Sequence, residues 1–464
     1  MPALSIGELA IASGGTLLRG LPDQRVDSYS IDTRRTKPGG VFFALRGTRT
    51  DGHAFLVQAT RAGAAAAFVE REPEVGQEIP EAVIRVNDVV AALASCGALA
   101  RRKSGAKFIA VTGSSGKTTI KELIAAGMAV GKQVHRTSGN QNNHLGVPLT
   151  LLSCPEDADV AVVELGMSAP GEIAALARMV DPDIALVANV GPAHMEFFRS
   201  LDDIAAAKGE MFAILRRDAT AVVNLSDDLV RVQSARHAGP RVTYGRNPQA
   251  DLVMESLRDH FIPGATLTVR HQETTLEIHL RLGGAHSAWN ALAALAVVLA
   301  AGGDLNEAQK AMARVEPGPG RCKIHKLPGG VVVVDDSYNS SPSALASVLE
   351  TLRHCHPTGR KILVMGDMLE LGTRESAFHR EAGKKAAQVG VQILVGVGAK
   401  ARAALDPARK GGVPETRHEE NAASAAETLP GLVRPGDLFV IKGSRAMGLE
   451  KVVQALLSST VEAH

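Results

Sequence analysis

The stretch from residue 111 to residue 119, Val-Thr-Gly-Ser-Ser-Gly-Lys-Thr-Thr, constrains the fold of this chain more than any other feature. An apolar run at residues 108–111 leads into it and predicts a buried strand, and residues 120–126 follow it with helical spacing. A strand, a glycine turn and a helix in this order form a cradle for phosphate, because backbone N–H groups approach an oligophosphate at the positive end of the helix. The predicted loop residues are Gly113, Ser114, Ser115, Gly116, Lys117, Thr118 and Thr119.

This loop is a shortened variant of the usual phosphate-binding loop. The usual pattern has a glycine six residues before the lysine, and Val111 occupies that position here. Lys117 is placed to reach the β- and γ-phosphates of a nucleotide, and a threonine hydroxyl after it is placed to ligate Mg²⁺. The alternative is a glycine-rich turn that binds no nucleotide, but the Lys-Thr-Thr run favours the nucleotide.

Length and composition limit what is built around this loop. A chain of 464 residues is too long for one hydrophobic core and predicts about three domains. Its apolar content of 45% and formal charge of +2 are typical of a globular enzyme and give no basic excess for a nucleic-acid surface. The four cysteines are scattered without a Cys-x-x-Cys pair, which favours a reducing cytoplasm over a disulfide framework or a zinc site. The first residues lack a charged region followed by an apolar core, so we expect no signal peptide, and the longest apolar run, 291–301, is too short to cross a bilayer.

Residues 1–104 are predicted to form a small α/β domain, with helices at 5–12 and 53–62 and strands at 40–45 and 66–69. Two polar clusters, 30–34 and 46–53, interrupt this pattern. Turn chemistry alone explains such clusters as loops that close the sheet. Alternatively, Arg34, Arg46 and His53 bind an anionic ligand. A basic hinge at 101–105 is expected to lead into the next domain.

Residues 105–313 are predicted to form the central, nucleotide-binding domain. Apolar strands alternate with helical stretches, which predicts a parallel sheet covered by helices on both faces; the strands are expected at 160–163, 184–187 and 221–223. Between residues 240 and 284 the pattern changes to short alternating strands, which indicates an antiparallel excursion of the same domain.

Ligands bind at the carboxyl ends of such strands, so the residues that follow the strands are candidate site residues. Glu164 follows one strand and suits Mg²⁺, which prefers oxygen ligands. His194 follows another in the run 189–194, although a lone loop histidine is more often structural. From its local sequence alone, Lys208 is interpreted as a solvent-exposed lysine on a helix. Asn290 is interpreted as a residue that caps or packs the apolar helix after it.

Residues 314–464 are predicted to form a third, Rossmann-like, doubly wound domain beyond a Pro/Gly-rich hinge at 316–321. Its strands are expected at 331–334, 361–364, 393–395 and 438–441. The loops after three of them, at 335–339, 366–372 and 442–445, are rich in polar and charged residues. The domain lacks Gly-x-Gly-x-x-Gly, so we expect a small charged substrate rather than a dinucleotide.

Seven motifs, taken together, resemble those of the Mur ligase family, the ATP-dependent amide-forming ligases of peptidoglycan precursor synthesis. They cover all three domains in order and stand at residues 112–119, 139–143, 164–167, 189–194, 208–210, 320–321 and 335–339. The motifs at residues 51–53, 366–372 and 442–445 are similar to those of the family members that join D-alanyl-D-alanine to UDP-N-acetylmuramoyl-tripeptide.

The resemblance implies a role for each domain and for residues at matching positions. The first domain would bind the UDP-sugar peptide, the central domain ATP, and the third domain the dipeptide. The implied roles are Lys117 for the β/γ-phosphates, Thr118 and Glu164 for one Mg²⁺, His194 for a second, Lys208 as a lysine carbamylated by CO₂, Asn290 for adenine, Arg321 for the γ-phosphate and Asp336 for the ribose. The catalytic set would be Lys117, His194, Lys208 and Arg321, with two Mg²⁺ ions and a monomeric enzyme.

The substrate-binding residues are expected in the matching loops. They are Ser30, Thr33, Arg34, Arg46, Gly47, Asp51, Gly52, His53, Asn142, Asn143, Tyr338, Asn339, Lys442, Ser444 and Arg445. Some positions depart from the family pattern: Ser341 and Ser287 each replace an expected Asn, and residues 197–199 (Phe-Phe-Arg) are unusual.

Two other functions remain open at this stage. One is a ligase of the same superfamily that adds a single amino acid, although the third domain lacks the Asp-Asn-Pro-Arg run used to recognise diaminopimelate. The other is a P-loop NTPase that acts as a switch or binding module. The third residue of the accepted peptide, diaminopimelate or lysine, is not fixed by the sequence.

Overall fold

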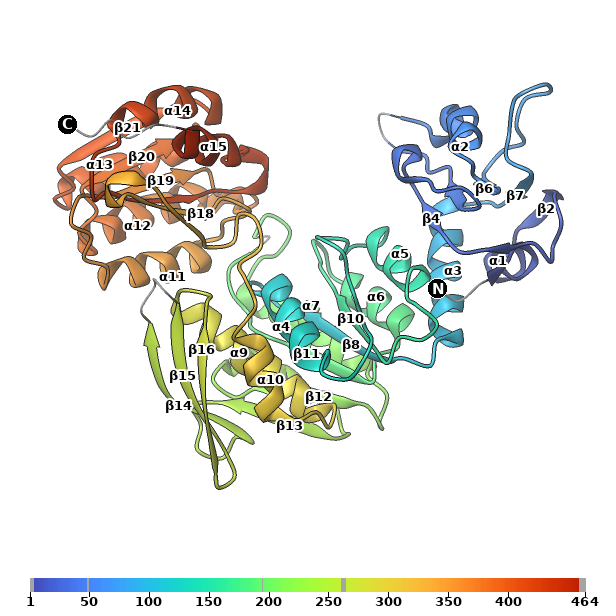
Figure 1. Ribbon diagram of the computed structural model, residues 1–464, viewed down its shortest axis with the longest axis horizontal. Coiled ribbons are helices and arrows are strands. Elements are labelled where there is room, and N and C mark those ends of the chain that lie inside the picture. Colours follow the sequence, from blue (N-terminus) through green and yellow to red (C-terminus); the bar gives the residue numbers. More distant parts are fainter. Residues whose placement is uncertain (1–3, 48–49, 194, 260–263, 459–464) are drawn as a thin grey trace.

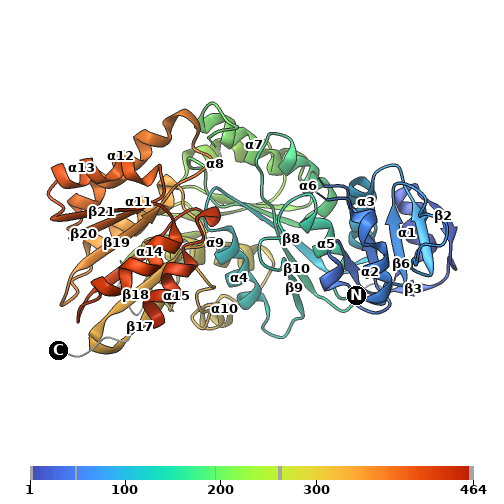
Figure 2. The same ribbon diagram turned by 90° about the horizontal axis from the view of Figure 1, so that it is seen from above.

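The computed structural model describes residues 4–47, 50–193, 195–259 and 264–458. Three α/β domains follow one another along the chain as separate lobes, from the blue N-terminal lobe to the red C-terminal lobe (Figures 1 and 2). This confirms the predicted α/β class and its three-domain organisation. The boundaries at 104/105 and 313/314 stay a prediction. Among the described residues, no helix has the length and apolar character needed to span a bilayer.

The first domain is a five-stranded sheet in the order β2-β7-β6-β5-β4, with β2 antiparallel and the other strands parallel, next to a β1-β3 pair. Its elements are β1 Leu4–Ser5, α1 Ile6–Ser13, β2 Thr16–Arg19, β3 Arg25–Val26, β4 Tyr29–Ser30, β5 Val41–Phe43, α2 Leu56–Arg61, β6 Ala66–Val69, β7 Ala82–Arg85 and α3 Val89–Lys103. The predicted helix at 5–12 is α1. It begins after Ser5 because Ser5 and Glu8 form a capping box, and it ends at Gly14 with φ of 65°.

The predicted hinge at 101–105 was wrong for residues 101–103, because they belong to helix α3. Its last turn contains residues 101–103, and only the short segment 104–106 separates it from the next strand. Arg101 donates to the backbone oxygens of Val180 (2.7 Å) and Asp181 (2.8 Å) in the central domain. At Gly97, α3 approaches the central domain so closely that an added Cβ would lie 2.7 Å from Pro148 Cβ. The first domain is therefore packed against the central domain through α3.

The central domain contains a nine-stranded sheet in the order β16-β15-β14-β13-β12-β11-β8-β10-β9. Its elements are β8 Lys107–Thr112, α4 Lys117–Met128, β9 Val134–Arg136, α5 Gly146–Leu152, β10 Val160–Glu164, α6 Glu172–Val180, β11 Ile184–Val187, α7 Leu201–Ile214, β12 Thr220–Asn224, α8 Asp228–Ser234, β13 Arg241–Gly245, β14 Leu252–Asp259, β15 Ala265–His271, β16 Thr274–Leu280, α9 Ala285–Ala300 and α10 Leu305–Met312. The seven strands β8 to β14 pair in parallel. Strand β15 pairs antiparallel with both β14 and β16. The predicted parallel sheet and its antiparallel excursion are confirmed.

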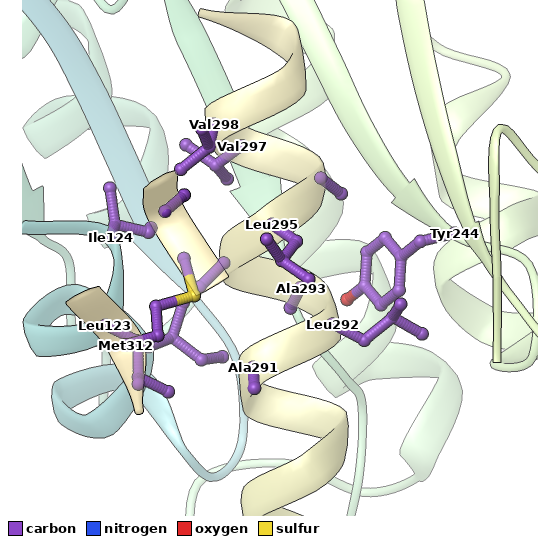
Figure 3. Packing of buried hydrophobic residues seen from close by; sticks show 14 of the residues in the cluster. Leu123, Ile124, Tyr244, Ala291, Leu292, Ala293, Leu295, Val297, Val298 and Met312 are labelled. Atoms are coloured by element: carbon purple, nitrogen blue, oxygen red, sulfur yellow. The ribbon is translucent and has the colours of Figure 1, made fainter. Parts of the chain in front are cut away.

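Helices cover both faces of this sheet because its central strands are apolar on both sides. In β8, Ile109 and Val111 face the core formed with α4, α9 and α10, whereas Phe108 and Ala110 face the core formed with α5, α6 and α7. Figure 3 shows α9 within the first of these cores, with Leu292 near Tyr244 on one side and the α4 residues on the other. This packing fixes the start of α4, where the phosphate loop ends.

The third domain is a six-stranded sheet in the order β17-β18-β22-β19-β20-β21, parallel except for β17. Its elements are β17 Lys323–Lys326, β18 Val332–Asp336, α11 Pro342–Arg353, β19 Lys361–Gly366, α12 Glu375–Gln388, β20 Ile393–Val397, α13 Leu405–Lys410, β21 Glu415–Glu419, α14 Ala422–Thr428, β22 Leu438–Lys442 and α15 Glu450–Ser458. All four predicted strands are present. The edge strands β17 and β21 were not predicted, because their polar sequences are partly exposed and lack the apolar run of a central strand.

The third domain contacts the central domain at several places. Ser347 on α11 lies 3.4 Å from His286 Nδ1 on α9, and Thr351 donates to Asp259 Oδ2 at the end of β14 (3.0 Å). The backbone N–H of Glu196 donates to the Glu370 carbonyl (3.1 Å). These contacts bring the strand ends of both sheets toward the same space.

Candidate active site

A cleft of about 1940 Å³ lies between the central and third domains. It is lined by the phosphate loop, the ends of β10 and β11, the start of α9, the 315–321 linker and the strand ends of the third domain. The predicted site residues that line it are Ser114, Ser115, Gly116, Lys117, Thr118, Thr119, Asn142, Asn143, Glu164, Asn290, Arg321, Asp336, Tyr338, Asn339, Lys442, Ser444 and Arg445. Gly113 and Lys208 lie behind this lining, and His194 lies outside the described residues.

The phosphate loop is held by Asn189, which lies two residues after the end of β11. The Asn189 side chain accepts from the Ser115 N–H (3.0 Å) and donates to the Ser115 carbonyl (3.1 Å), and its own carbonyl accepts from Ser114 N–H. The sequence motifs did not indicate a role for Asn189, although its position after a central strand was the available signal. A loop fixed in this way keeps its N–H groups oriented before any ligand arrives.

Gly116 is required at the start of α4 for two reasons. Its φ is 79°, which residues with a Cβ rarely adopt. An added Cβ would also lie 2.3 Å from Oδ1 of Asn290 on α9. Asn290 therefore packs directly on the phosphate loop, and its predicted contact with adenine stays a prediction.

Lys117 donates to the Gly113 carbonyl (2.8 Å) and so folds back over the loop. Its pKa lies below the ordinary lysine value because the surrounding protein shields the ammonium from water; the Glu164 carboxylate opposes this effect and the Arg321 guanidinium adds to it. The three charges thus interact across the cleft. An incoming phosphate would give the ammonium a stronger partner than a carbonyl.

Thr118 and Glu164 form an oxygen pair that suits a hard cation. The Thr118 hydroxyl donates to Glu164 Oε2 at 2.9 Å, and Asn142 donates to the other carboxylate oxygen at 2.8 Å. Two neighbouring ligands of an octahedral Mg²⁺ with bonds of 2.0–2.1 Å lie about 2.9 Å apart, so the spacing fits this ion. Asn142 thus orients Glu164, while Asn143 accepts from the backbone N–H groups of Leu145 and Gly146.

No group of three or more His, Cys, Asp or Glu side chains that could hold a metal is found within the described part of the chain. Mg²⁺ usually takes one or two carboxylates and completes its shell with water and substrate phosphates. The Thr118–Glu164 pair beside a phosphate loop has this character. The residues present therefore fit a magnesium ion bound together with a nucleotide.

Lys208 is buried in the middle of α7, with only 2% of its surface exposed. The interpretation of this residue as a solvated helix lysine was wrong, since apolar residues before and after it on α7 pack into the core. Burial holds the pKa of Lys208 well below the ordinary value, and the positive charge of Lys117 lowers it further. The neutral amine is thereby favoured.

Arg321 connects the third domain to the phosphate loop. Its guanidinium donates to the Thr118 hydroxyl at 3.0 Å and lies over the Tyr338 ring, 4.0 Å from the centroid. The preceding Gly320 donates its N–H to Asp335 at the end of β18 (3.1 Å), which ties the linker to the third sheet. Arg321 therefore reaches the central domain from a linker that is anchored to the end of β18.

The other third-domain residues form a polar group around Tyr338. The Lys442 ammonium pairs with Asp336 Oδ2 (2.6 Å) and donates to the Asn339 carbonyl (3.0 Å). Arg445 lies 5.5 Å from the Tyr338 centroid. The Ser444 hydroxyl accepts from the backbone N–H of Leu369 (2.9 Å), which positions the 366–372 loop. This group can recognise a small charged molecule, with Lys442 setting the position of Asp336.

The predicted substrate residues of the first domain, in the described parts of the two loops, do not line this cleft. They are Ser30, Thr33, Arg34, Arg46, Gly47, Asp51, Gly52 and His53. Arg34 is exposed and forms a bidentate ion pair with Asp32, which lowers the pKa of Asp32 to about 2. His53 is buried, and both ring nitrogens are used: Nδ1 pairs with Asp51 (2.7 Å) and Nε2 accepts from the Glu70 N–H (2.9 Å).

The departures from the family pattern have local structural explanations. Ser341 caps α11 by accepting from the Ala344 N–H (3.3 Å), directly before Pro342. Ser287 is buried and donates to the Gly283 carbonyl (2.7 Å). Phe198 is buried in the central core, whereas Phe197 is 53% exposed.

Family models match all three parts of the chain. They are the Mur ligase family catalytic domain at residues 25–104, the Mur ligase middle domain at 111–298 and the Mur ligase glutamate ligase domain at 320–445. The chain belongs to the Mur ligase family. It is therefore an ATP-dependent ligase that forms a C–N bond.

Named relatives and solved structures narrow this class. The UDP-N-acetylmuramoyl-tripeptide--D-alanyl-D-alanine ligase of Bacillus subtilis is 34% identical over 450 residues, 96% of this chain and 96% of that protein. A crystal structure of MurF from Acinetobacter baumannii superposes with a TM-score of 0.88 at 29% identity, covering 98% of this chain and 100% of that one. MurF from Thermotoga maritima in complex with ADP gives a TM-score of 0.79 at 28% identity, covering 93% and 97%.

The fit of Gly116 gives a direct test of nucleotide binding. We expect Gly116→Ala to lower the affinity for ADP by about tenfold or more, because its Cβ would collide with Asn290 and displace the loop. Gly131→Ala is the matched control, since Gly131 has a φ of 68° but has no atom within 4 Å of the added Cβ. Isothermal titration calorimetry with ADP measures both variants. Equal affinities for the two would contradict this view of the loop.

Proposed function

We propose that this chain joins D-alanyl-D-alanine to UDP-N-acetylmuramoyl-tripeptide, with conversion of ATP to ADP and phosphate and an acyl phosphate as intermediate. The observation that carries the proposal is the contact between Arg321 and Thr118, which puts the phosphate loop and the third-domain pocket in one cleft. The choice of substrates is supported by the named relatives, which match along nearly the whole chain.

The first half-reaction activates the peptide carboxylate, which is a poor electrophile. A carboxylate oxygen attacks the γ-phosphorus of ATP, the bond to the β–γ bridging oxygen breaks, and ADP leaves while an acyl phosphate forms. Two anions must meet in this step. Lys117, which donates to the Gly113 carbonyl, and Arg321 are cations placed to offset their repulsion.

Thr118 and Glu164 would hold a magnesium ion, which would supply positive charge to the phosphate oxygens. Glu164 is 2% exposed, and its carboxylate is already oriented by Asn142 and Thr118. Little rearrangement is therefore needed for these oxygens to accept the ion. A second ion is part of the proposal, with Lys208 and His194 as its candidate protein ligands.

Lys208 would serve as a ligand only after modification, because an ammonium has no lone pair and repels Mg²⁺. Its neutral amine would form a bond to the carbon of CO₂ and release one proton to solvent, which leaves an anionic carbamate whose oxygens suit Mg²⁺. The depth of Lys208 in α7 supports this role, since the buried site disfavours the charged amine.

The second half-reaction forms the amide. The lone pair of the dipeptide's neutral amine attacks the acyl carbon, phosphate leaves, and the proton released from the amine passes to solvent. The amine must be held about 3 Å from the acyl carbon, which is a task of orientation. The polar group of Tyr338, Asn339, Ser444 and Arg445 is the candidate pocket for the dipeptide, because it faces the phosphate loop across the cleft.

The remaining parts of the proposal concern the rest of the molecule and its setting. The 30–34 and 46–53 loops would bind the UDP-sugar peptide, with Arg46 as a partner for its phosphates and with Arg34 as a second partner once it exchanges the Asp32 carboxylate for a phosphate. Asp51 and His53 are paired with each other. Asp336 would bind the ribose. The activity would contribute to peptidoglycan synthesis, and through the cell wall to cell shape, cell division and the cell cycle. A cytoplasmic monomer stays a prediction.

A panel of amine acceptors tests the proposed reaction. With ATP, Mg²⁺ and UDP-N-acetylmuramoyl-tripeptide present, we expect phosphate release and amide formation with D-alanyl-D-alanine and not with single amino acids, diaminopimelate, lysine and glutamate among them. Mass spectrometry of the product identifies the new amide. Phosphate release that needs no peptide would instead favour an NTPase switch, and product from a single amino acid would favour the other ligase class.

Lys208 has its own test. We expect Lys208→Ala to abolish turnover, because the carbamate oxygens are lost, and a short-chain carboxylic acid to restore part of it by occupying the same space. Lys310→Ala, on the exposed side of α10, is the control and should keep full activity. Phosphate release in the presence of ATP, Mg²⁺ and both substrates is measured for Lys208→Ala, for Lys208→Ala with the added acid and for Lys310→Ala. Undiminished activity of Lys208→Ala would remove Lys208 from the site.

A further inference from the structure

Lys121 is a fully buried charged residue that the reaction described above does not use. It lies on α4, three residues after Thr118 and four after Lys117, so it shares their helix face. Its exposed fraction is 0%. Burial of an ammonium is costly unless its donors are paired, so the partners of this side chain indicate what it does.

The ammonium of Lys121 is directed at one segment, residues 137–143, which follows β9. Its Nζ donates to the Thr137 carbonyl at 2.7 Å and to the Gly139 carbonyl at 3.4 Å. Its charge is paired with Glu122 Oε1 at 3.1 Å, and Glu122 also binds Arg136 Nε at 2.7 Å, directly before the segment. The first turns of α4 are thus joined to the start of this segment.

Both ends of segment 137–143 act on Glu164. At one end, the Thr137 hydroxyl accepts from the Glu164 N–H (2.9 Å). At the other end, the Asn142 side chain donates to Glu164 Oε1 (2.8 Å), and the Asn142 carbonyl accepts from the Gly166 N–H (2.8 Å). The segment therefore fixes the backbone and the side chain of the residue whose Oε2 accepts from Thr118.

We propose that Lys121 is a positioning residue for the proposed magnesium site: it holds segment 137–143 in place, and the segment in turn fixes the Glu164 carboxylate. The proposal rests on the role of Glu164 given under the proposed function. Residues behind the direct ligands commonly orient them, and their loss typically lowers metal affinity or activity by about 10- to 100-fold. Lys121 differs from the metal ligands in that it reaches the ion only through the segment.

Another lysine of this chain provides a matched comparison. Lys361 in the third domain also donates to two backbone carbonyls, those of Leu352 (2.9 Å) and Val389 (3.2 Å). It does not line the cleft, and the segments that it joins do not reach Glu164. If a lysine that binds two carbonyls only stabilises the fold, Lys121→Met and Lys361→Met should behave alike.

The test measures nucleotide binding by the full chain as a function of Mg²⁺ concentration, with no turnover involved. In calorimetric titrations with ADP, we expect Lys121→Met to shift the Mg²⁺ concentration that gives half of the Mg²⁺-dependent gain in affinity upward by about tenfold or more. Affinity for ADP in EDTA should stay unchanged. Hydrogen exchange at residues 138–143 should become faster in Lys121→Met and stay unchanged in Lys361→Met.

An unshifted Mg²⁺ midpoint in folded Lys121→Met would overturn the proposal, as would an equal shift in Lys361→Met. Should Lys121→Met not fold, Lys121→Gln replaces it and is judged by the same two results. The wild type and Glu164→Gln separate this test from the proposed function. If the wild type shows no Mg²⁺ effect or Glu164→Gln keeps the whole effect, the metal role of Glu164 fails; if both behave as expected and Lys121→Met does not shift, only the role of Lys121 fails.

Discussion

The hydrogen bond from Arg321 to the Thr118 hydroxyl joins two halves of the site that are 203 residues apart in sequence. On one side, Thr118 lies in the first turn of α4, and its hydroxyl donates to Glu164. On the other, Arg321 lies on Tyr338 and is anchored through Gly320 to β18. Neither sheet alone supplies both a phosphate cradle and a polar pocket. The cleft exists because the linker brings this guanidinium to the phosphate loop.

The charged groups in and behind the cleft are already held in place by protein partners. Lys208 is buried away from water, and the positive charge of Lys117 lowers the pKa of its amine further. Glu164 is buried with both oxygens engaged by Thr118 and Asn142. Donors and acceptors fixed before a substrate binds need little reorganisation during a phosphoryl transfer. Lys121 is tolerated at full burial because its ammonium is paired with two backbone carbonyls and with Glu122.

The sequence predicted those features that depend on local pattern. Apolar runs such as 108–111 and 438–441 are buried in parallel sheets on both faces, so strand and position follow from the run itself. The site residues at strand ends, Glu164 among them, follow from the rule that strand ends meet at one edge. Edge strands β17 and β21 carry no such run. The extent of α3 was also missed, because its basic last turn is typical of a hinge as well as of a helix end.

Features set by distant packing could not be predicted. Lys208 and Lys121 have the local sequence of solvated helix residues, and only the neighbouring segments bury them. The contacts of Asn142 with Glu164 and of His53 with Asp51 were not indicated by the sequence, and the predicted contact of both residues with substrate stays a prediction. The most direct test of the account is Arg321→Ala, with ADP affinity and kcat for amide formation measured on the same preparation. We expect nearly unchanged ADP affinity and a fall in kcat of about 10²- to 10³-fold, because Arg321 contacts the phosphate loop from the third domain. Full kcat in this variant would contradict it.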